Sequence, residues 1–436
     1  MAGQLLIYTP ELKPRISYIF SLFFESLIDT AYKLTTDLSE YKSYEGPKLN
    51  YSEQAIDSNE VFVHANGLLS ETGVTPQNIT VGDWEGLKIF YQANDGVLPF
   101  DVFAASFYLV SCYEEYLPFI PDKHGRYPHT ESLAFKNNFL DIPLVNYWAE
   151  RLKNMLLKAY PDLVIKENTY TFIPTVDVDI AYAHKGRSLT LTIASYLKAL
   201  SKFNFPLVLN KVLTLLGLRK DEYDTFRYQK GIFKKRNVSP VYFILAGKRG
   251  EFDKNISTDS NSFESLIREL RYFANVGIHP SYQSANNPEV VRNEMANVEK
   301  YLGGKVSKSR QHFLKMSLPD TYHCLLQSGV TDDYTMLYAG MHGFRASICS
   351  PFFFYDLKEE RVLQVKVHPG ALMDGTLKEY EKLSPGDAIK ISKGLISKVK
   401  ECKGEFIPVF HNHNLSETGE WKGWREVFET IVENAV

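Results

Sequence analysis

Cysteine is scarce in this sequence, and no two cysteines form a C-x-x-C pair. The four residues are spread through the chain, at Cys112, Cys324, Cys349 and Cys402, which excludes a disulfide framework or a zinc ribbon as the basis of the fold. Long apolar runs are also missing, because no window reaches the roughly 18 uncharged apolar residues that a membrane span requires. A basic excess is absent too: the formal net charge is -3, which argues against a nucleic-acid partner.

A secretion signal is not recognisable at the N-terminus. The first ten residues contain no basic region and only a three-residue apolar run, Leu5 to Ile7. A signal peptide needs a basic region followed by a longer apolar run. We therefore expect a cytoplasmic protein, with any membrane contact being peripheral to the inner membrane. Hydrophobic residues at 44% and charged residues at 23% are typical of a globular protein.

The chain has 436 residues, which is too long for one ordinary core and predicts two domains. Residues 1–165 are expected to form a smaller α/β domain, with a strand at Leu5–Tyr8 and helices at Ile16–Leu34 and Asp101–Leu117. Residues 166–436 alternate strand-like and helix-like segments, which is typical of a parallel barrel or a wound sheet.

An insertion at about 180–235 interrupts the second domain. Within it, apolar residues of 189–220 recur among lysines and an arginine. Such a basic amphipathic segment is typical of helices that lie on a membrane surface. The alternative is a cap over the active-site mouth, which is favoured because Pro206 divides the segment.

The most informative stretch is Tyr170 to Asp179, an apolar, β-branched run that ends in two carboxylates. It predicts a buried strand whose last side chains reach the sheet edge where ligands collect in α/β folds. Asp177 and Asp179 are two residues apart and would share one face of a strand. Two such charges favour a bound cation or a shared proton, although capping of a helix or turn is the alternative role.

Further ionisable residues follow other predicted strands. They are His279, Arg310, His312, His411 and His413. Each of these residues alone would be interpreted as a turn residue or as a buried side chain whose polar atoms are hydrogen-bonded. In a barrel, however, the carboxyl ends of all strands converge on one mouth. Placement of the whole set at such ends therefore predicts a single site.

The second half of the chain resembles the polysaccharide deacetylases, the NodB-homology group of carbohydrate esterases, over roughly residues 168–434. The opening family motif is similar to Thr175-Val-Asp-Val-Asp179, the second is half matched by His279-Pro-Ser-Tyr-Gln283, and the arginine motif is similar to Arg310-Gln-His-Phe-Leu314. The closing motif is similar to Val409-Phe-His411. The resemblance implies a distorted (β/α) barrel, preceded here by the smaller α/β domain.

The resemblance also implies roles for these residues. Asp177 would be the catalytic base and His411 the general acid. Asp179 and His279 would hold a divalent metal, with zinc expected and cobalt or nickel as alternatives. Because Gln283 stands where the family has a second histidine, the third ligand is either Gln283 or His312. Residues expected to bind or orient the substrate are Arg310, Gln283, Asp333, Arg345 and His413.

The function implied is hydrolysis of an N-acetyl or related acyl group on an amino sugar, in a glycan or a glycan precursor. Two alternatives remain open. The first is a glycosidase that uses Asp177 with a distant acid such as Asp333. The second is a catalytically inactive carbohydrate-binding or assembly protein.

Overall fold

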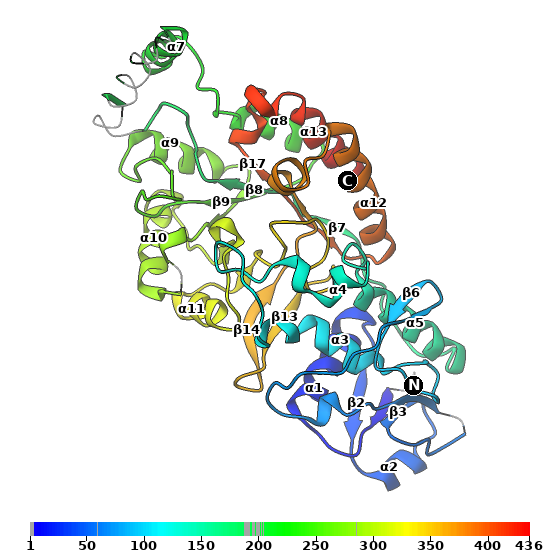
Figure 1. Cartoon of the computed structure of the whole chain (residues 1–436). Helices are drawn as coiled ribbons and strands as arrows, with labels where there is room; N and C mark the ends of the chain where they lie inside the picture. Colours follow the sequence, from blue (N-terminus) through cyan, green and yellow to red (C-terminus); the bar gives the residue numbers. More distant parts are fainter. Residues whose placement is uncertain are drawn as a thin grey trace.

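Two separate sheets organise the chain (Figure 1). The computed structural model describes residues 4–58, 60–186, 205–284 and 286–436, together with residues 192, 193, 197, 201 and 203. A four-stranded sheet lies near the N-terminus, and a nine-stranded sheet carries most of the remaining strands. Each sheet has its own set of helices.

The N-terminal sheet is parallel and has the order β2-β1-β3-β4. Its strands are β1 (Leu5–Tyr8), β2 (Tyr32–Thr35), β3 (Lys48–Ser52) and β4 (Val61–His64). The accompanying elements are α1 (Pro14–Ser21), α2 (Leu38–Ser43), α3 (Val102–Val110), α4 (Leu133–Lys136), α5 (Leu144–Ala159) and the hairpin of β5 (Gly82–Trp84) and β6 (Leu87–Ile89). Every residue of α3 is buried, so this helix lies within the core, as expected for a helix without a polar face.

One predicted helix in this region was wrong. Helix α1 continues as a π-helical turn at Leu22–Leu27 and then stops, so the expected helix at 16–34 is too long. Asp29 takes a left-handed conformation (φ 53°), which ends the helix. Residues from Tyr32 onward pair with β1 instead, because backbone pairing in the sheet outweighs a helical apolar pattern.

The second sheet has the order β13-β14-β12-β11-β10-β9-β8-β17-β15. Its strands are β8 (Thr175–Val178), β9 (Val241–Ile244), β10 (Asn275–Ile278), β11 (Lys308–Ser309), β12 (Asp332–Asp333), β13 (Phe352–Asp356), β14 (Arg361–Val367), β15 (Leu372–Met373) and β17 (Pro408–His411). Among the described strands of this sheet, β13 and β14 are the only antiparallel pair. A small parallel pair, β7 (Thr171–Phe172) and β16 (Glu405–Phe406), precedes β8 and β17. The carboxyl ends of the parallel strands therefore line one edge.

In the part of the chain that the structure describes, six helices follow the strands of this sheet besides α7 (Phe205–Leu215) in the insertion. They are α8 (Phe226–Lys235), α9 (Asn261–Leu270), α10 (Pro288–Leu302), α11 (Asp320–Ser328), α12 (Pro385–Glu401) and α13 (Trp424–Ala435). Helix α10 begins at an Asn287 cap with proline next and ends at Gly303 in the left-handed region, so local sequence determines both its ends. The α/β class is confirmed. The described sheet ends at β13 and β15 without a pairing that closes it, so the barrel is not confirmed.

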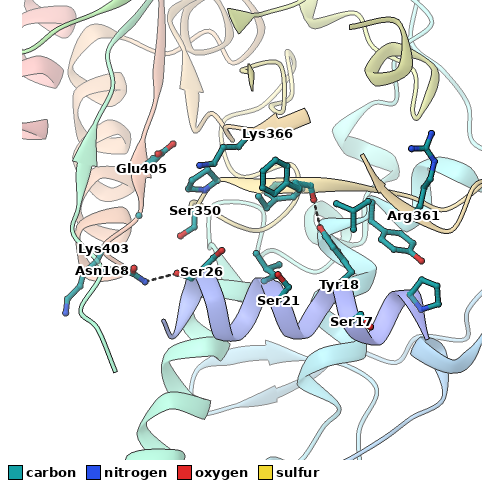
Figure 2. A pocket seen from close by; sticks show the side chains of 18 of the residues that line it. Ser17, Tyr18, Ser21, Ser26, Asn168, Ser350, Arg361, Lys366, Lys403 and Glu405 are labelled. Atoms are coloured by element: carbon teal, nitrogen blue, oxygen red, sulfur yellow. Dashed lines mark hydrogen bonds between the residues drawn. The ribbon is translucent and has the colours of Figure 1, made fainter. Parts of the chain in front are cut away.

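Buried ion pairs join the N-terminal helices to the second sheet. Arg15 of α1 contacts Glu360, in the turn between β13 and β14, with 2.5 Å between Nη2 and Oε1. Arg345 contacts Glu115 with 2.6 Å between Nη2 and Oε2, and both side chains are buried. A groove of about 730 Å³ lies beside α1, where the Tyr18 hydroxyl donates to the Phe353 carbonyl at 2.9 Å (Figure 2).

The insertion contains helix α7 (Phe205–Leu215), which lies apart from both sheets in Figure 1. Part of the segment 189–220 falls outside the described residues, namely 189–191, 194–196, 198–200, 202 and 204. In the part of the chain that the structure describes, no helix has the length and apolar character needed to cross a membrane.

Candidate active site and metal centre

A pocket of about 140 Å³ lies at the carboxyl edge of the second sheet. Asp177 is in β8, Asp179 directly follows it, His279 follows β10 and His411 ends β17. His411 pairs directly with Asp177 across β17 and β8. Strand register alone therefore places these side chains around one cavity, as expected for the ends of parallel strands.

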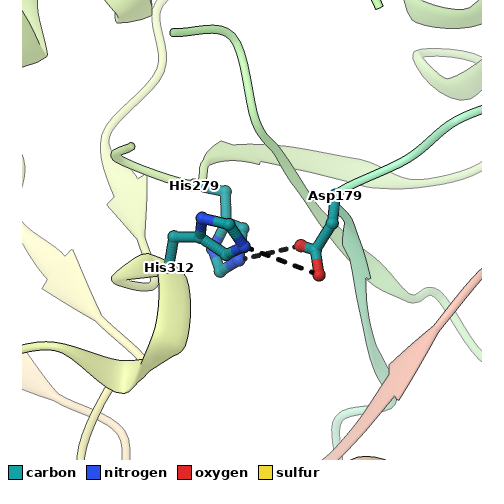
Figure 3. A group of neighbouring side chains, drawn as sticks. All are labelled: Asp179, His279 and His312. Atoms are coloured by element: carbon teal, nitrogen blue, oxygen red, sulfur yellow. Dashed lines mark ion pairs between the residues drawn. The ribbon is translucent and has the colours of Figure 1, made fainter. Parts of the chain in front are cut away.

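Three of the residues around this pocket form a group that could hold a metal ion (Figure 3). His279 Nε2 lies 3.2 Å from Asp179 Oδ1, and His312 Nε2 lies 3.7 Å from Asp179 Oδ2. One ligand atom of each residue lies within 4.8 Å of the others. Two imidazoles and one carboxylate match a catalytic zinc site that leaves one position open.

The orphaned oxygen of Asp179 supports the fit of a cation. Asp179 Oδ1 is buried and has no hydrogen-bond partner among the described residues, although His279 Nε2 is close. A buried carboxylate oxygen without a partner carries a large desolvation cost, which an ion between the three residues would offset. The donor set therefore suits a divalent metal.

Both histidines are oriented by their second ring nitrogen. His279 Nδ1 lies 2.6 Å from the Arg310 carbonyl oxygen, so it carries the proton and donates. His312 Nδ1 lies 2.9 Å from Asp253 Oδ1. Each ring thereby directs Nε2 toward Asp179, as outer partners do for metal-binding histidines.

The pKa of His312 also reflects its acidic surroundings. Burial lowers this pKa, but the carboxylates of Asp179 and Asp253 outweigh burial and raise it to about 9. Burial raises the pKa of Asp179, yet His312, His411 and His279 together hold it well below its usual range. The carboxylates around His312 thus favour a cation at this position, whether a proton or a metal.

Asp177 is held by a fully buried arginine. Arg310 Nη1 donates to Asp177 Oδ1 and to Thr175 Oγ1, both at 2.8 Å, and its Nε donates to the Tyr334 carbonyl at 3.0 Å. The guanidinium also lies 4.6 Å from the ring centroid of Phe243. Such fixed contacts hold the Asp177 carboxylate in one orientation.

His411 faces Asp374 on its other side. Its Nδ1 lies 2.6 Å from Asp374 Oδ1, and its backbone N–H donates to Asp374 Oδ2 at 2.8 Å. Burial lowers the pKa of His411, but the charges of Asp374 and Asp179 raise it to about 10. His411 Nε2 remains 3.7 Å from Asp179 Oδ2, so a protonated imidazole points into the pocket.

His413 lines the same pocket in a different protonation state. Burial and the nearby His411 lower its pKa to about 4, and its Nδ1 has no hydrogen-bond partner among the described residues. Two histidines of one short segment therefore differ in charge near neutrality, which suits one as an acid and the other as a neutral hydrogen-bonding group.

Arg310 contacts Asp177 without lining the pocket, and three other sequence-predicted residues are also absent from the pocket lining. Gln283 is exposed and lies beside Gly250. Asp333 is fully buried, where it accepts from Ser309 Oγ at 2.7 Å and from Thr335. Arg345 is not at a strand end but pairs with Glu115. The pocket thus brings together the aspartates and histidines and leaves these three outside.

Sequence reasoning missed several residues of the site. Asp253 follows no predicted strand, and Asp374 follows the two-residue β15, which is too short to recognise from a pattern. Glu379 and Tyr380 line the pocket from a π-helical turn, Thr376–Tyr380. Only the run Leu372–Met373 before Asp374 was a usable indication, and two residues do not establish a strand.

The N-terminal part of the chain also contributes to the pocket lining, through Arg126. Its Nη1 donates to the Phe313 carbonyl, and its Nε donates to Asp122 Oδ2 at 2.8 Å. Phe313 adopts a left-handed conformation (φ 60°) directly after His312. Because such a conformation is costly for a bulky residue, the contact from Arg126 stabilises the backbone that carries His312.

Comparison with known proteins gave one family match. Residues 5–161 match a family of unknown function, DUF7033. No curated protein sequence matches the chain. The family match is confined to the N-terminal part and assigns no activity.

Comparison with solved structures gave matches to part of the chain at low identity. A protein of Mycobacterium smegmatis assigned as a polysaccharide deacetylase has 15% identity and a TM-score of 0.39, with coverage of 61% of this chain and 85% of that chain. One of Pseudomonas aeruginosa PAO1, assigned likewise, has 13% identity and a TM-score of 0.36, with coverage of 60% and 84%. The polysaccharide deacetylase Bc1974 of Bacillus cereus has 10% identity and a TM-score of 0.30, with coverage of 61% and 86%.

Proposed function

We propose that this chain is a metal-dependent hydrolase that removes an N-acetyl or related acyl group from an amino sugar in a glycan or glycan precursor. One arrangement supports the proposal above all. A candidate metal group of two histidines and one aspartate lies beside an arginine-held aspartate and an aspartate-held histidine. Amide hydrolysis needs these parts together: a Lewis acid, a base and an acid.

Asp179, His279 and His312 are the residues that would hold the metal. When bound, a divalent ion supplies a Lewis acid that polarises an acyl oxygen and lowers the pKa of water. Zinc is the expected ion, since imidazole and carboxylate suit it, and cobalt and nickel are alternatives. Gln283 has no part in this proposal, because its side chain is exposed.

Asp177 would accept the proton of the attacking water. Arg310 holds Oδ1 of its carboxylate and leaves Oδ2 at 3.8 Å from His279 Nε2, toward the metal group. A carboxylate in this position can act as a general base as the water attacks the acyl carbon.

His411 would protonate the departing amine. Its raised pKa keeps the proton on the ring in the resting site, and Asp374 holds the Nδ1 side so that Nε2 faces the pocket. A histidine that carries its proton near neutrality can act as the general acid of this reaction.

Arg126 and His413 would bind or orient the substrate at the pocket wall. Both line the cavity, whereas Asp333 and Arg345 are occupied by buried contacts elsewhere. The glycosidase alternative needs a second carboxyl acid across the substrate. Asp333, the acid expected for that alternative, does not line the pocket.

Two further proposals concern organisation and location. We propose residues 1–165 and 166–436 as the two domains, which the two separate sheets support. The N-terminal domain would complete one wall of the site through Arg126. A cytoplasmic location stays a prediction from the sequence.

The test is acetate release from N-acetylated amino-sugar oligomers by the full chain loaded with zinc, cobalt or nickel. We expect metal-dependent release that is lost in the Asp177→Asn variant. Full metal binding without release from a broad set of N-acetylated and O-acetylated glycans would favour the inactive carbohydrate-binding alternative. Release without dependence on Asp177 or metal would contradict the proposal.

A further inference from the structure

Helix α7 buries two polar residues and exposes several of its large apolar residues. Phe205, Leu209 and Leu216 are 61%, 57% and 67% exposed. Lys211 and Thr214, on the opposite side of the helix, are only 8% and 2% exposed. A helix of a protein surrounded by water has the reverse distribution, so α7 is built to face an apolar environment.

The exposed apolar residues form one continuous stripe. Phe205, Leu209 and Val212 follow one another at spacings of four and three residues, and therefore lie on one face of α7. Leu215, at the end of the helix, and Leu216 and Leu218, in the turn after it, are also exposed and extend the apolar surface. We call these six residues the α7 stripe. Scattered single apolar residues need no explanation, but a contiguous patch of this kind marks an interaction surface.

No described element covers the α7 stripe. Figure 1 shows α7 apart from both sheets, and no described helix or strand packs extensively along it. The stripe must therefore meet something outside the described chain, or remain exposed to water at a large free-energy cost.

Charge distinguishes among the partners that could cover the stripe. Residues 189–220 contain five basic residues and no acidic residue, whereas the whole chain has a net charge of -3. The basic residues are Lys198, Lys202, Lys211, Arg219 and Lys220. Arg219 and Lys220 are exposed and directly follow the stripe. A strongly apolar face with flanking cations and no acids matches a membrane with anionic headgroups.

We propose that the α7 stripe docks on the surface of an anionic lipid bilayer. Helix α7 has 11 residues, which span only about 16 Å at 1.5 Å per residue. This is about half of the roughly 30 Å hydrocarbon core. The helix therefore lies in the interface, with its leucines and phenylalanine among the acyl chains and its basic end at the headgroups.

The base of the insertion joins α7 to the candidate active site. Asp221 accepts from the backbone N–H groups of Ala183, His184 and Lys185 at 2.7–3.2 Å, which ties the two ends of the insertion together. Two residues later, the Tyr223 ring lies 5.7 Å from that of His413 in the pocket wall. Docking would thus hold the pocket close to the membrane. Combined with the proposed function, this indicates a glycan attached to a membrane lipid as substrate.

The test is flotation of the full chain with vesicles of phosphatidylcholine, with and without phosphatidylglycerol. The stripe variant combines Phe205→Ser, Leu209→Ser and Leu216→Ser. We expect wild-type protein to float with the anionic vesicles, and the stripe variant to bind at least about tenfold more weakly per replaced side chain. A matched control combines Ile120→Ser, Val164→Ser and Tyr272→Ser, three exposed apolar residues elsewhere, and should bind like the wild type.

A second pair of variants tests the charge. Arg219→Gln with Lys220→Gln should weaken binding to anionic vesicles about fivefold per removed charge. Lys166→Gln with Lys305→Gln removes the same charge from other exposed positions and should have no effect. Equal binding to neutral and anionic vesicles would overturn the charge requirement.

The remaining outcomes concern the stripe itself. Absence of vesicle binding by the wild type would overturn the proposal. Concentration-dependent dimerisation that the stripe variant abolishes, without vesicle binding, would instead assign the stripe to contact with a second copy. Flotation requires no turnover, so its result is independent of the deacetylase proposal. A lipid-linked substrate is tested separately, by comparing acetate release from free and lipid-attached glycans.

Discussion

Asp253 and His312 are 59 residues apart in the chain, yet the Asp253 carboxylate lies 2.9 Å from His312 Nδ1. Asp253 is fully buried and also accepts from the Tyr282 backbone N–H at 2.9 Å. This pair determines which nitrogen of His312 faces Asp179. The third ligand of the candidate metal group thus depends on a residue that no sequence motif indicated.

Replacement of Asp253 should weaken metal binding without removing a ligand. We expect Asp253→Asn to reduce zinc affinity about 10- to 100-fold, the usual effect of losing an outer partner of a metal-binding histidine. Isothermal titration of the metal-free protein measures this. Asp332→Asn is a matched control, because Asp332 also pairs with a histidine, His368, outside the pocket. An unchanged affinity in Asp253→Asn would contradict the proposed role.

Asp177→Asn should abolish turnover and leave metal content near that of the wild type. The amide keeps the shape of the side chain but cannot accept a proton from water, so we expect a loss of at least about 100-fold in kcat. Elemental analysis and acetate release on the same preparation check both parts. Loss of the metal together with activity would mean that Asp177, rather than Asp179, is a ligand.

Asp179→Ala, His279→Ala and His312→Ala should each empty the metal site. With three protein ligands, removal of one leaves too little chelation. Gln283 adds a sharper test, because its exposed side chain lies outside the pocket. We therefore expect Gln283→His to give no rescue of His312→Ala in metal content. Restored metal binding in that double variant would show that residue 283 reaches the site.

Arg126→Ala should lower metal affinity although Arg126 is no ligand. Its loss removes the hydrogen bond that holds the Phe313 carbonyl, next to His312. We expect a fall of several-fold in zinc affinity, with far-ultraviolet circular dichroism unchanged, because the left-handed Phe313 then loses support. Arg361→Ala, which removes an exposed arginine paired with Glu359, is the control. Equal metal affinities in both variants would reject the coupling.

The His368 cluster should make stability depend on pH. His368 stacks on Tyr334 at 4.4 Å and contacts Asp332 and Glu405 through its two nitrogens. Burial lowers its pKa, but the hydrogen bonds to Asp332 and Glu405 outweigh burial and raise it. The hydrogen bond from His368 in turn lowers the pKa of Asp332 to about 2.

The sign of this dependence follows from the two shifts. The raised pKa of His368 stabilises the fold below about pH 6.5, and the effect is lost as pH rises through the folded value. The lowered pKa of Asp332 contributes above about pH 4 and is lost toward pH 2. We expect His368→Gln to cost about 1–3 kcal/mol near pH 5.5 and much less at pH 9. Urea unfolding at both values measures this, and an equal cost at both would contradict the assignment.

Much of the fold was predictable because local patterns suffice for it. The alternation of strands and helices after residue 166 predicted the α/β class, and Asn287, Pro288 and Gly303 marked both ends of α10. Local patterns failed where pairing with a distant strand decided the outcome. Residues 32–35 continue a helical pattern, yet pair with β1.

The sequence by itself determined which strand ends carry ionisable residues. Four of these residues could be predicted to share one edge of the sheet, namely Asp177, Asp179, His279 and His411. The apolar run of each strand shows where that strand ends. Tertiary structure alone decided which of these contact one another and which outside residues orient them. Asp253, Asp374 and Arg126 reach the site from loops and from the N-terminal part. Such contacts form because packing brings distant chain segments together. Hydrophobic periodicity indicates helices and strands, but it does not indicate which distant residues will meet.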